Sequence, residues 1–137
     1  MDKKIDITSK EGKKGIVVGF ATSDLENIDA HFGSTKQFAV YSVDKEGSEQ
    51  IQIIKTTKDA LGDGNKTDMI VEALDGIDIV YFLDIGPTAA AKVINSKIFP
   101  IKYKEVVKID TELEKLVGML GTNPPPFIKK IVEAKGL

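Results

Sequence analysis

The sequence predicts an α/β protein in which helices pack on a mixed β-sheet, and three observations lead to that prediction. Residues 16–20 are almost continuously β-branched or aromatic, which is typical of a central strand covered on both faces. Two strand-like segments then flank a turn at 44–47, as in an antiparallel meander. Beyond residue 76, strand-like and helix-like segments alternate, and this order predicts a parallel crossover beside the meander.

Length and composition bound the organisation of the chain. Its 137 residues, 42% of them hydrophobic, suffice for one well-buried core and are too few for two ordinary domains. We therefore expect one domain over residues 15–137, preceded by a polar leader over 1–14. Within the leader, Ile5 and Ile7 alternate with polar residues ahead of a charged, glycine-containing turn at 9–15, so a short leading strand is expected.

Charge and residue usage exclude several functional classes. Nineteen Lys and Arg against 21 Asp and Glu give a net charge of -2, which leaves no basic surplus for a nucleic-acid backbone. No apolar stretch approaches the roughly 18 residues of a membrane span, and the first residues lack a secretory apolar core. We therefore expect a cytoplasmic protein without nucleic-acid or membrane partners. The absence of cysteine excludes disulfides, thiolate nucleophiles and metal sites that need several sulfur ligands.

The middle of the chain supplies the meander and the first helix. Strands are predicted over 37–43 and 49–55, from their β-branched and aromatic residues and partial alternation. After a glycine-rich turn at 62–65, apolar positions recur at helical spacing. A helix is therefore expected from about 66 to 75, with Gly76 as its stop.

A strand-helix-strand unit comes next. Residues 77–83 form an apolar run typical of a buried strand, and 99–103 form another. Between them, a helix is predicted from the Gly-Pro-Thr bend at 86–88 through residue 94, because proline is tolerated in a first helical turn.

Two helices are predicted in the C-terminal part. Thr111-x-x-Glu114 has the form of a capping box and is followed by an apolar stripe up to Gly121, which ends the helix. Three consecutive prolines at 124–126 cannot continue it. The apolar residues of 127–132 then mark a last short helix.

The single histidine, His31, lies in the loop between the first two predicted strands. Carboxylates apart, its imidazole is the only side chain here that readily binds a transition metal. The loop leaves the C-terminal end of a strand expected to be central, where open α/β sheets usually place ligands. Phe32 can anchor the loop and Gly33 can bend it, so that the imidazole projects. The alternative is a turn histidine whose ring bonds a backbone carbonyl.

Two other features could carry chemistry. The segment 83–91 is a strand end, a bend and a helix start built from small residues, and the helix N-terminus at Gly86 would favour an anion. The alternative is that small residues let this helix pack closely on the sheet. Asp24, Asp29 and Asp84 could hold magnesium for a phosphohydrolase or nuclease only if they converge, and their spacing does not fix such a site.

The order of motifs along residues 16–132 resembles the dinitrogenase iron-molybdenum cofactor biosynthesis family, which includes NifX, NafY and the C-terminal domain of NifB. The most specific string is Asp-x-His-Phe-Gly at 29–33. The other matching strings are Phe-Ala-Thr-Ser-Asp at 20–24, Phe-Ala-Val-Tyr at 38–41, Asp-Gly-Ile-Asp-Ile-Val-Tyr at 75–81, Ala-Ala-Ala-Lys at 89–92, Pro-Ile-Lys at 100–102 and Asn-Pro-Pro-Pro-Phe at 123–127.

The resemblance implies a ribonuclease H-like, three-layer fold with a mixed five-stranded sheet flanked by helices. It also implies a non-enzymatic carrier that holds an iron-sulfur cluster precursor of the nitrogenase iron-molybdenum cofactor and passes it between cofactor assembly proteins. His31 is then the expected metal contact, since loose ligation by one imidazole with amides and hydroxyls suits a cargo that must be released. The residues expected to bind the cluster are His31, Phe32, Gly33, Ser34, Thr22, Ser23 and Gly86.

One departure from the family is the absence of thiols. Many relatives have cysteine in the region that residues 77–86 occupy here, and this chain has none. Either His31 suffices with backbone help, or the chain is a diverged carrier with another cargo or weaker affinity. A third alternative is a cluster-free protein-interaction or regulatory module of the same fold, with no cofactor.

Overall fold

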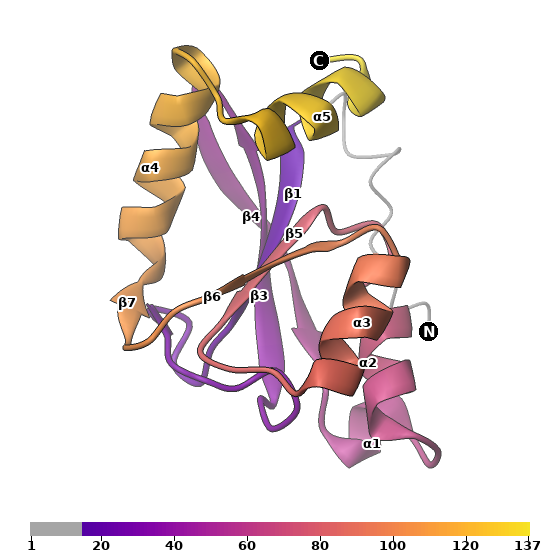
Figure 1. The fold of residues 1–137 in the computed structure, drawn as a ribbon. Helices are drawn as coiled ribbons and strands as arrows, with labels where there is room; N and C mark the ends of the chain where they lie inside the picture. Colours follow the sequence, from indigo (N-terminus) through magenta and orange to yellow (C-terminus); the bar gives the residue numbers. More distant parts are fainter. Residues whose placement is uncertain (1–14) are drawn as a thin grey trace.

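A mixed five-stranded sheet forms the centre of the protein (Figure 1). The computed structural model describes residues 15–137. The strands of this sheet are β1 (Ile16–Ala21), β3 (Gln37–Asp44), β4 (Gly47–Lys55), β5 (Ile79–Phe82) and β6 (Phe99–Lys102). They lie in the order β4-β3-β1-β5-β6, with β3 antiparallel to β1 and β4, and β5 parallel to β1 and β6. The predicted central strand, meander and parallel crossover are confirmed.

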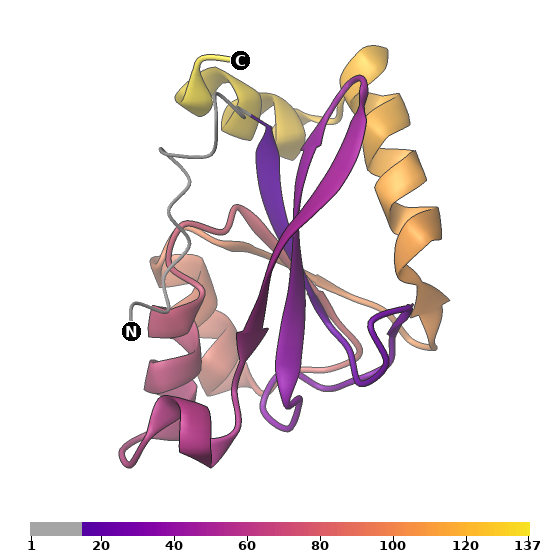
Figure 2. The ribbon, with the colours of Figure 1, turned by 180° about the vertical axis from the view of Figure 1, so that it is seen from behind.

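Helices cover both faces of the sheet. In residues 15–137 they are α1 (Lys58–Leu61), α2 (Lys66–Ala73), α3 (Pro87–Asn95), α4 (Ile109–Gly121) and α5 (Pro126–Lys135). Figures 1 and 2 show α1, α2 and α3 on one side of the sheet and α4 on the other. The α/β fold with a mixed five-stranded sheet and flanking helices is therefore confirmed, and its ribonuclease H-like classification stays a prediction.

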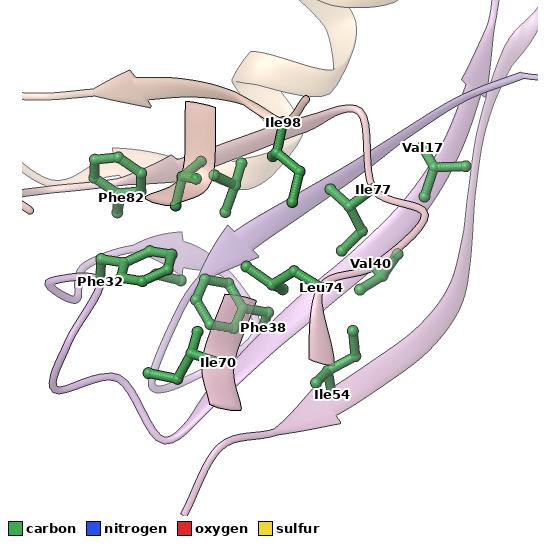
Figure 3. Close-up of a cluster of buried hydrophobic side chains, with 13 residues drawn as sticks. Val17, Phe32, Phe38, Val40, Ile54, Ile70, Leu74, Ile77, Phe82 and Ile98 are labelled. Carbon is green, nitrogen blue, oxygen red and sulfur yellow. The ribbon is translucent and has the colours of Figure 1, made fainter. Parts of the chain in front are cut away.

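The central strand divides its side chains between two hydrophobic clusters. Val17 and Ala21 belong to the cluster on the side of α2 and α3, whereas Ile16, Val18 and Phe20 belong to the cluster beneath α4 and α5. All six residues of β1 are buried, which explains why its sequence is apolar throughout rather than alternating. Figure 3 shows the first cluster, which the loop after β1 joins through a phenylalanine.

A second, two-stranded sheet was not anticipated from the sequence. β2 (Asn27–Ile28) pairs antiparallel with β7 (Val107–Lys108). Next to this pair, the Ile109 N–H donates to the Glu26 carbonyl at 2.9 Å. Strands of two residues are too short to show alternation, so no pattern could reveal them. The pairing fixes the start of α4 against the loop that carries the histidine.

The predicted capping box is wrong. α4 begins at Ile109 with Lys108 as its N-cap residue, and no side chain caps it. Thr111 lies within the first helical turn, where it is exposed. The helix starts earlier because the β2–β7 pair leads directly into it, so backbone pairing replaces the side-chain cap that the motif suggested.

The other helix predictions are close to the structure. Asn65 caps α2 by accepting the Asp68 N–H at 3.0 Å, and α5 begins at Pro126. The four-residue α1 was not predicted. No helix of residues 15–137 combines the length and apolar character that crossing a membrane would require. The predicted leading strand at Ile5 and Ile7 lies outside the described residues, and the division into leader and single domain stays a prediction.

Candidate functional site

The loop between β1 and β3 begins with a turn that its own side chains hold closed. The Thr22 hydroxyl accepts the Leu25 N–H at 2.9 Å, and Asp24 Oδ1 accepts the N–H groups of Glu26 and Asn27 at 2.9 Å each. These bonds hold Leu25 in the left-handed region, at a φ of 66°. The Glu26 N–H, with smaller contributions from Asn27 and Thr22, lowers the pKa of Asp24 to about 2. Thr22 is buried, and its hydroxyl serves this turn.

A second set of bonds joins the two ends of the same segment. Asp29 accepts the Ser23 N–H at 2.8 Å and the Ser23 hydroxyl at 2.6 Å. Both the N–H and the hydroxyl of Ser23 are therefore engaged by the Asp29 carboxylate. Asp24 and Asp29 are likewise occupied with the loop itself. In the part of the chain that the structure describes, no three or more His, Asp or Glu side chains converge on a point where they could hold a metal ion.

Beyond Asp29, the loop is held by a buried phenylalanine. The Phe32 side chain is fully buried, with its ring centroid 5.8 Å from that of Phe38 and 5.7 Å from that of Phe82 (Figure 3). Its N–H donates to the Asp84 carbonyl at 2.8 Å, just after β5. The preceding side chain, His31, is exposed. The expected anchor is thus present, and it presents the imidazole to solvent.

A tight turn then returns the chain to β3. The His31 carbonyl accepts the Thr35 N–H at 3.0 Å, and the Thr35 hydroxyl donates to the Gln37 carbonyl at 2.8 Å. From the chain between β4 and α1, the Thr56 hydroxyl donates to the Thr35 carbonyl at 2.8 Å. The hydrogen-bonding groups that close this turn are mostly backbone and buried threonine groups, so the exposed side chains of the turn are not needed to hold it.

His31 lies at the edge of a shallow depression of about 290 Å³. The depression is lined by His31, Gly33, Ser34, Asp84, Ile85 and Gly86. It therefore brings together four of the seven predicted site residues from two segments far apart in sequence. Of the other three, Phe32 lies in the core, and Thr22 and Ser23 bond within the first part of the loop.

Both glycines of the depression lack an obvious structural reason to be glycine. A Cβ added to Gly33 or to Gly86 would meet no heavy atom within 4 Å. Gly86 has a φ of -72°, which any residue adopts. Packing and backbone conformation would thus tolerate a side chain at either position. What the glycines do provide is open space beside the imidazole.

The charges around the depression are mixed. Asp84 Oδ1 accepts the Ile85 N–H at 2.8 Å and lies 3.8 Å from Lys102 Nζ, so a cation from β6 partly offsets the carboxylate. Gly86 is the N-cap of α3, whose first turn has no side-chain cap and contains Pro87. The N-terminal end of a helix attracts anionic groups through its amides and dipole. The depression thus offers one imidazole, one serine hydroxyl and a helix N-terminus to a ligand.

Asp84 and Ile85 are lining residues that the sequence did not assign to this site. The available signal was the order of segments, because the C-terminal ends of parallel β1 and β5 must meet at one edge of the sheet. His31 lies far along the loop that follows β1, however. Two backbone bonds fix where that loop meets the end of β5: the Phe32 N–H donates to the Asp84 carbonyl, and the Leu83 N–H donates to the Ala30 carbonyl at 2.9 Å.

The fold and this depression define a small α/β protein with a surface site built around one imidazole. The chain belongs to the dinitrogenase iron-molybdenum cofactor family, whose profile matches residues 14–119. The family resemblance expected from the motifs is confirmed.

Three known proteins illustrate the relationship. The chain is 36% identical to NifX of Rhodobacter capsulatus over 127 residues, which cover 88% of this chain and 80% of that protein. It is 25% identical to NifY of Azotobacter vinelandii over 125 residues, 91% of this chain and 51% of that protein. The crystal structure of the protein PH0822 matches 75% of this chain and 89% of that chain with a TM-score of 0.60. Its 18% sequence identity supports the shared fold alone.

Proposed function

We propose that this protein is a non-enzymatic carrier, which binds an iron-sulfur cluster precursor of the iron-molybdenum cofactor at the His31 depression and passes it to cofactor assembly proteins. The observation that carries the proposal is the position of His31, the only histidine of the chain, exposed between two glycines that packing does not require. Membership of the family supports the choice of cargo.

The geometry of the depression suits a cargo that is held loosely. His31 would coordinate one metal of the cluster, and Ser34 and the amides at the start of α3 would offer hydrogen bonds to its anionic sulfides. Gly33 and Gly86 would leave room for a cluster much larger than a single ion. A single protein ligand is readily exchanged for one from an acceptor protein, which is what transfer requires.

Phe32 has an indirect part in this proposal. Its buried ring and its bond to Asp84 hold the neighbouring imidazole at the depression, so it positions the ligand without touching cargo. Thr22 and Ser23 would act similarly by closing the first part of the loop.

The experiment is anaerobic loading of the purified protein with the cluster, followed by gel filtration and measurement of iron in the protein peak. The substitution His31→Asn should weaken retention of the cluster by more than about tenfold. Even groups that only orient a metal ligand contribute roughly 10- to 100-fold to affinity. Lys36→Asn, exposed in the same loop and outside the depression, is the matched control. Equal retention by wild type and His31→Asn would contradict the assignment of His31.

A second candidate is the cluster-free interaction module, and the observation that favours it is the absence of cysteine. The loading experiment separates the two functions. If wild-type protein retains no cluster but still binds an assembly protein in its absence, the interaction module is the better description.

A further inference from the structure

A hollow larger than the His31 depression lies away from the histidine and is lined by residues of α5, the end of α3 and the start of β6. Figure 1 shows where these three elements lie in the fold. The volume of the hollow is about 1020 Å³, against about 290 Å³ for the His31 depression. Asp78, just before β5, lines this hollow, whereas Asp84, just after β5, lines the depression. Six residues of extended chain span about 20 Å, so the two features lie at opposite ends of one strand. We call the hollow the α5 groove, with Ile94, Lys97, Phe99, Phe127, Lys130 and Ile131 as its main lining residues.

Apolar side chains are unusually exposed in the α5 groove. Ile94 is 58% exposed and Phe99 is 41% exposed, and they are two of the four exposed large hydrophobic residues in the described part of the chain. Phe99 stacks on Phe127, with ring centroids 4.1 Å apart. The groove is therefore bordered by a preformed aromatic pair linking β6 and α5. The exposed apolar side chains are gathered in one hollow rather than scattered over the surface, which favours binding of another molecule there.

The charge of the α5 groove restricts what can bind there. Its one acidic residue, Asp78, is engaged by Lys135 Nζ at 3.0 Å and by the Val17 N–H at 2.8 Å. Lys97 and Lys130 also line the groove, and no acidic partner for them lies among the lining residues. The groove therefore combines an apolar surface with a positive border. The matching ligand is an apolar segment that carries acidic residues.

The first residues of the chain do not have the acidic charge that such a segment needs. Residues 1–14 contain five lysines and three acidic residues, so their charge has the same sign as the groove. A symmetric dimer through this groove would place the lysines of one copy near those of the other, because a two-fold interface apposes the same patch on both subunits. Charge complementarity instead favours an acidic segment of a different protein.

Lys97 lies at a backbone position that glycine would fit with less strain. It follows the end of α3 in the left-handed region, at a φ of 66°. The Ile98 N–H donates to the Val93 carbonyl at 3.2 Å and the Lys97 N–H to the Ile94 carbonyl at 2.9 Å, which together form a Schellman motif. Glycine is the residue that fits this position without strain. Lysine here adds a cation at the groove in spite of the backbone conformation.

The edge strand β6 argues for a helical ligand rather than an added strand. Phe99 and Tyr103 direct their N–H groups to β5, at 2.8 Å from the Asp78 carbonyl and 2.9 Å from the Phe82 carbonyl. The backbone N–H groups of the residues between them point alternately away from β5, toward the free edge. One of these residues is Pro100, which has no N–H to donate. Strand addition at this edge would therefore lack a hydrogen bond, and proline is a common protection of exposed edges.

We propose that the α5 groove docks an acidic amphipathic helix of a partner protein, at the end of the sheet opposite the His31 depression. A carrier could then be held by its partner through the groove while the histidine stays accessible. The groove is defined without reference to any cluster, so the proposal stands or fails separately from the proposed function.

The test is an NMR titration of the full-length protein with two synthetic helices of about 14 residues, four helical turns each. Both carry leucine at i, i+3, i+4 and i+7, and the remaining positions are mostly glutamate in one and lysine in the other. The glutamate helix should shift the amides of 94–99 and 127–135 and bind at least about tenfold more tightly than the lysine helix. Since the whole chain is negatively charged, non-specific attraction would favour the lysine helix instead.

Two matched pairs of variants locate the binding site. Lys130→Glu should weaken binding of the glutamate helix about fivefold, whereas Lys129→Glu, at an exposed neighbouring position that does not line the groove, should not. Ile94→Ser should weaken it roughly tenfold, whereas Val106→Ser, 55% exposed and outside the groove, should leave it unchanged.

Several results would overturn the proposal. They are tighter binding of the lysine helix, equal effects of the two members of either pair, and no amide shifts in the groove at about 1 mM helix, a concentration that would reveal even weak docking. Self-association that Ile94→Ser abolishes would assign the groove to a second copy. Cross-relaxation between Ile5 or Ile7 and Phe99 in the free protein would assign it to the chain's own first residues.

Discussion

The two halves of the β1–β3 loop are held in different ways. In residues 22–29, side-chain oxygens of Thr22, Asp24 and Asp29 accept backbone N–H groups of the same segment. In residues 30–35, one buried aromatic ring and backbone bonds to the end of β5 hold the chain. The first half therefore uses its polar side chains to hold itself in place, whereas the second half leaves the side chains of His31 and Ser34 exposed.

This difference teaches which polar residues of a loop can serve a ligand. Ser23 and Ser34 are both exposed serines, yet the hydroxyl of Ser23 donates to Asp29 at 2.6 Å while Ser34 lines the depression. A hydrophobic anchor such as Phe32 is thus a way to fix a loop without consuming hydrogen-bonding groups. Substitutions that remove the buried ring or the side-chain hydrogen bonds separately test whether the two halves are held differently.

The largest effect is expected from Phe32→Ala. The ring is fully buried between two other phenylalanines, so its removal should lower the free energy of unfolding by about 3–5 kcal/mol, as for other buried aromatic residues. Leu25→Ala removes the partly buried apolar residue of the first half and should cost at most about 1 kcal/mol. Urea denaturation followed by circular dichroism measures both. If Phe32→Ala and Leu25→Ala lower the free energy of unfolding equally, the two halves of the loop do not differ in how much they depend on an apolar side chain.

An intermediate effect, which is present above about pH 4 and disappears in acid, is expected from Asp24→Asn. The folded-state pKa of Asp24 is lowered from its ordinary value of 3.8 to about 2, because its carboxylate accepts the Glu26 N–H and further bonds. The stabilisation is therefore fully present above about pH 4 and declines as the pH falls toward 2, where the folded state also binds the proton. Wild type should lose its advantage over Asp24→Asn in that interval.

The measurement is thermal unfolding of both proteins between pH 2 and pH 6, the interval that brackets the two pKa values of Asp24. The difference in melting temperature should be constant above pH 4 and shrink below it. His31→Asn is the control, since it lies in the half of the loop without this carboxylate. If the difference between wild type and Asp24→Asn does not change with pH, the Asp24 carboxylate does not stabilise the first half of the loop.

Strong, repeated signals made the sheet predictable from sequence. The apolar run of β1 and the alternating strand and helix segments after residue 76 reflect burial of whole elements, which many residues specify together. The β2–β7 pair and the start of α4 depend on two-residue contacts between distant segments. Thr111-x-x-Glu114 matched a local motif, but pairing of Lys108 with Asn27 had already fixed the helix start.

Only part of the lining of the depression could be named from the sequence, because local strings are visible there and contacts between distant segments are not. His31, Gly33 and Ser34 were found because they stand together in one string, and Gly86 because it begins a helix after a strand. Thr22 is the same kind of small hydroxyl residue as Ser34. Composition cannot tell which hydroxyl bonds its own loop and which faces solvent, since that choice depends on the closed turn around Asp24.

The smallest effect on stability, with a distinct effect on binding, is expected from Gly33→Ala. An added Cβ meets nothing within 4 Å, and the residue does not need a left-handed conformation, so the free energy of unfolding should change by no more than about 0.5–1 kcal/mol, in the stabilising direction. The same change at Gly118, an open position on α4, should also leave folding intact.

Cluster retention distinguishes these two glycine variants. The methyl group at residue 33 would occupy space beside His31, so retention after anaerobic loading should fall, whereas Gly118→Ala should bind as wild type does. Retention falls in Gly33→Ala only if the second half of the loop lines the space that the cluster occupies. If Gly33→Ala folds normally and retains the cluster fully, the space between His31 and Gly86 is not where the cargo lies, and the contrast between the two halves concerns stability alone.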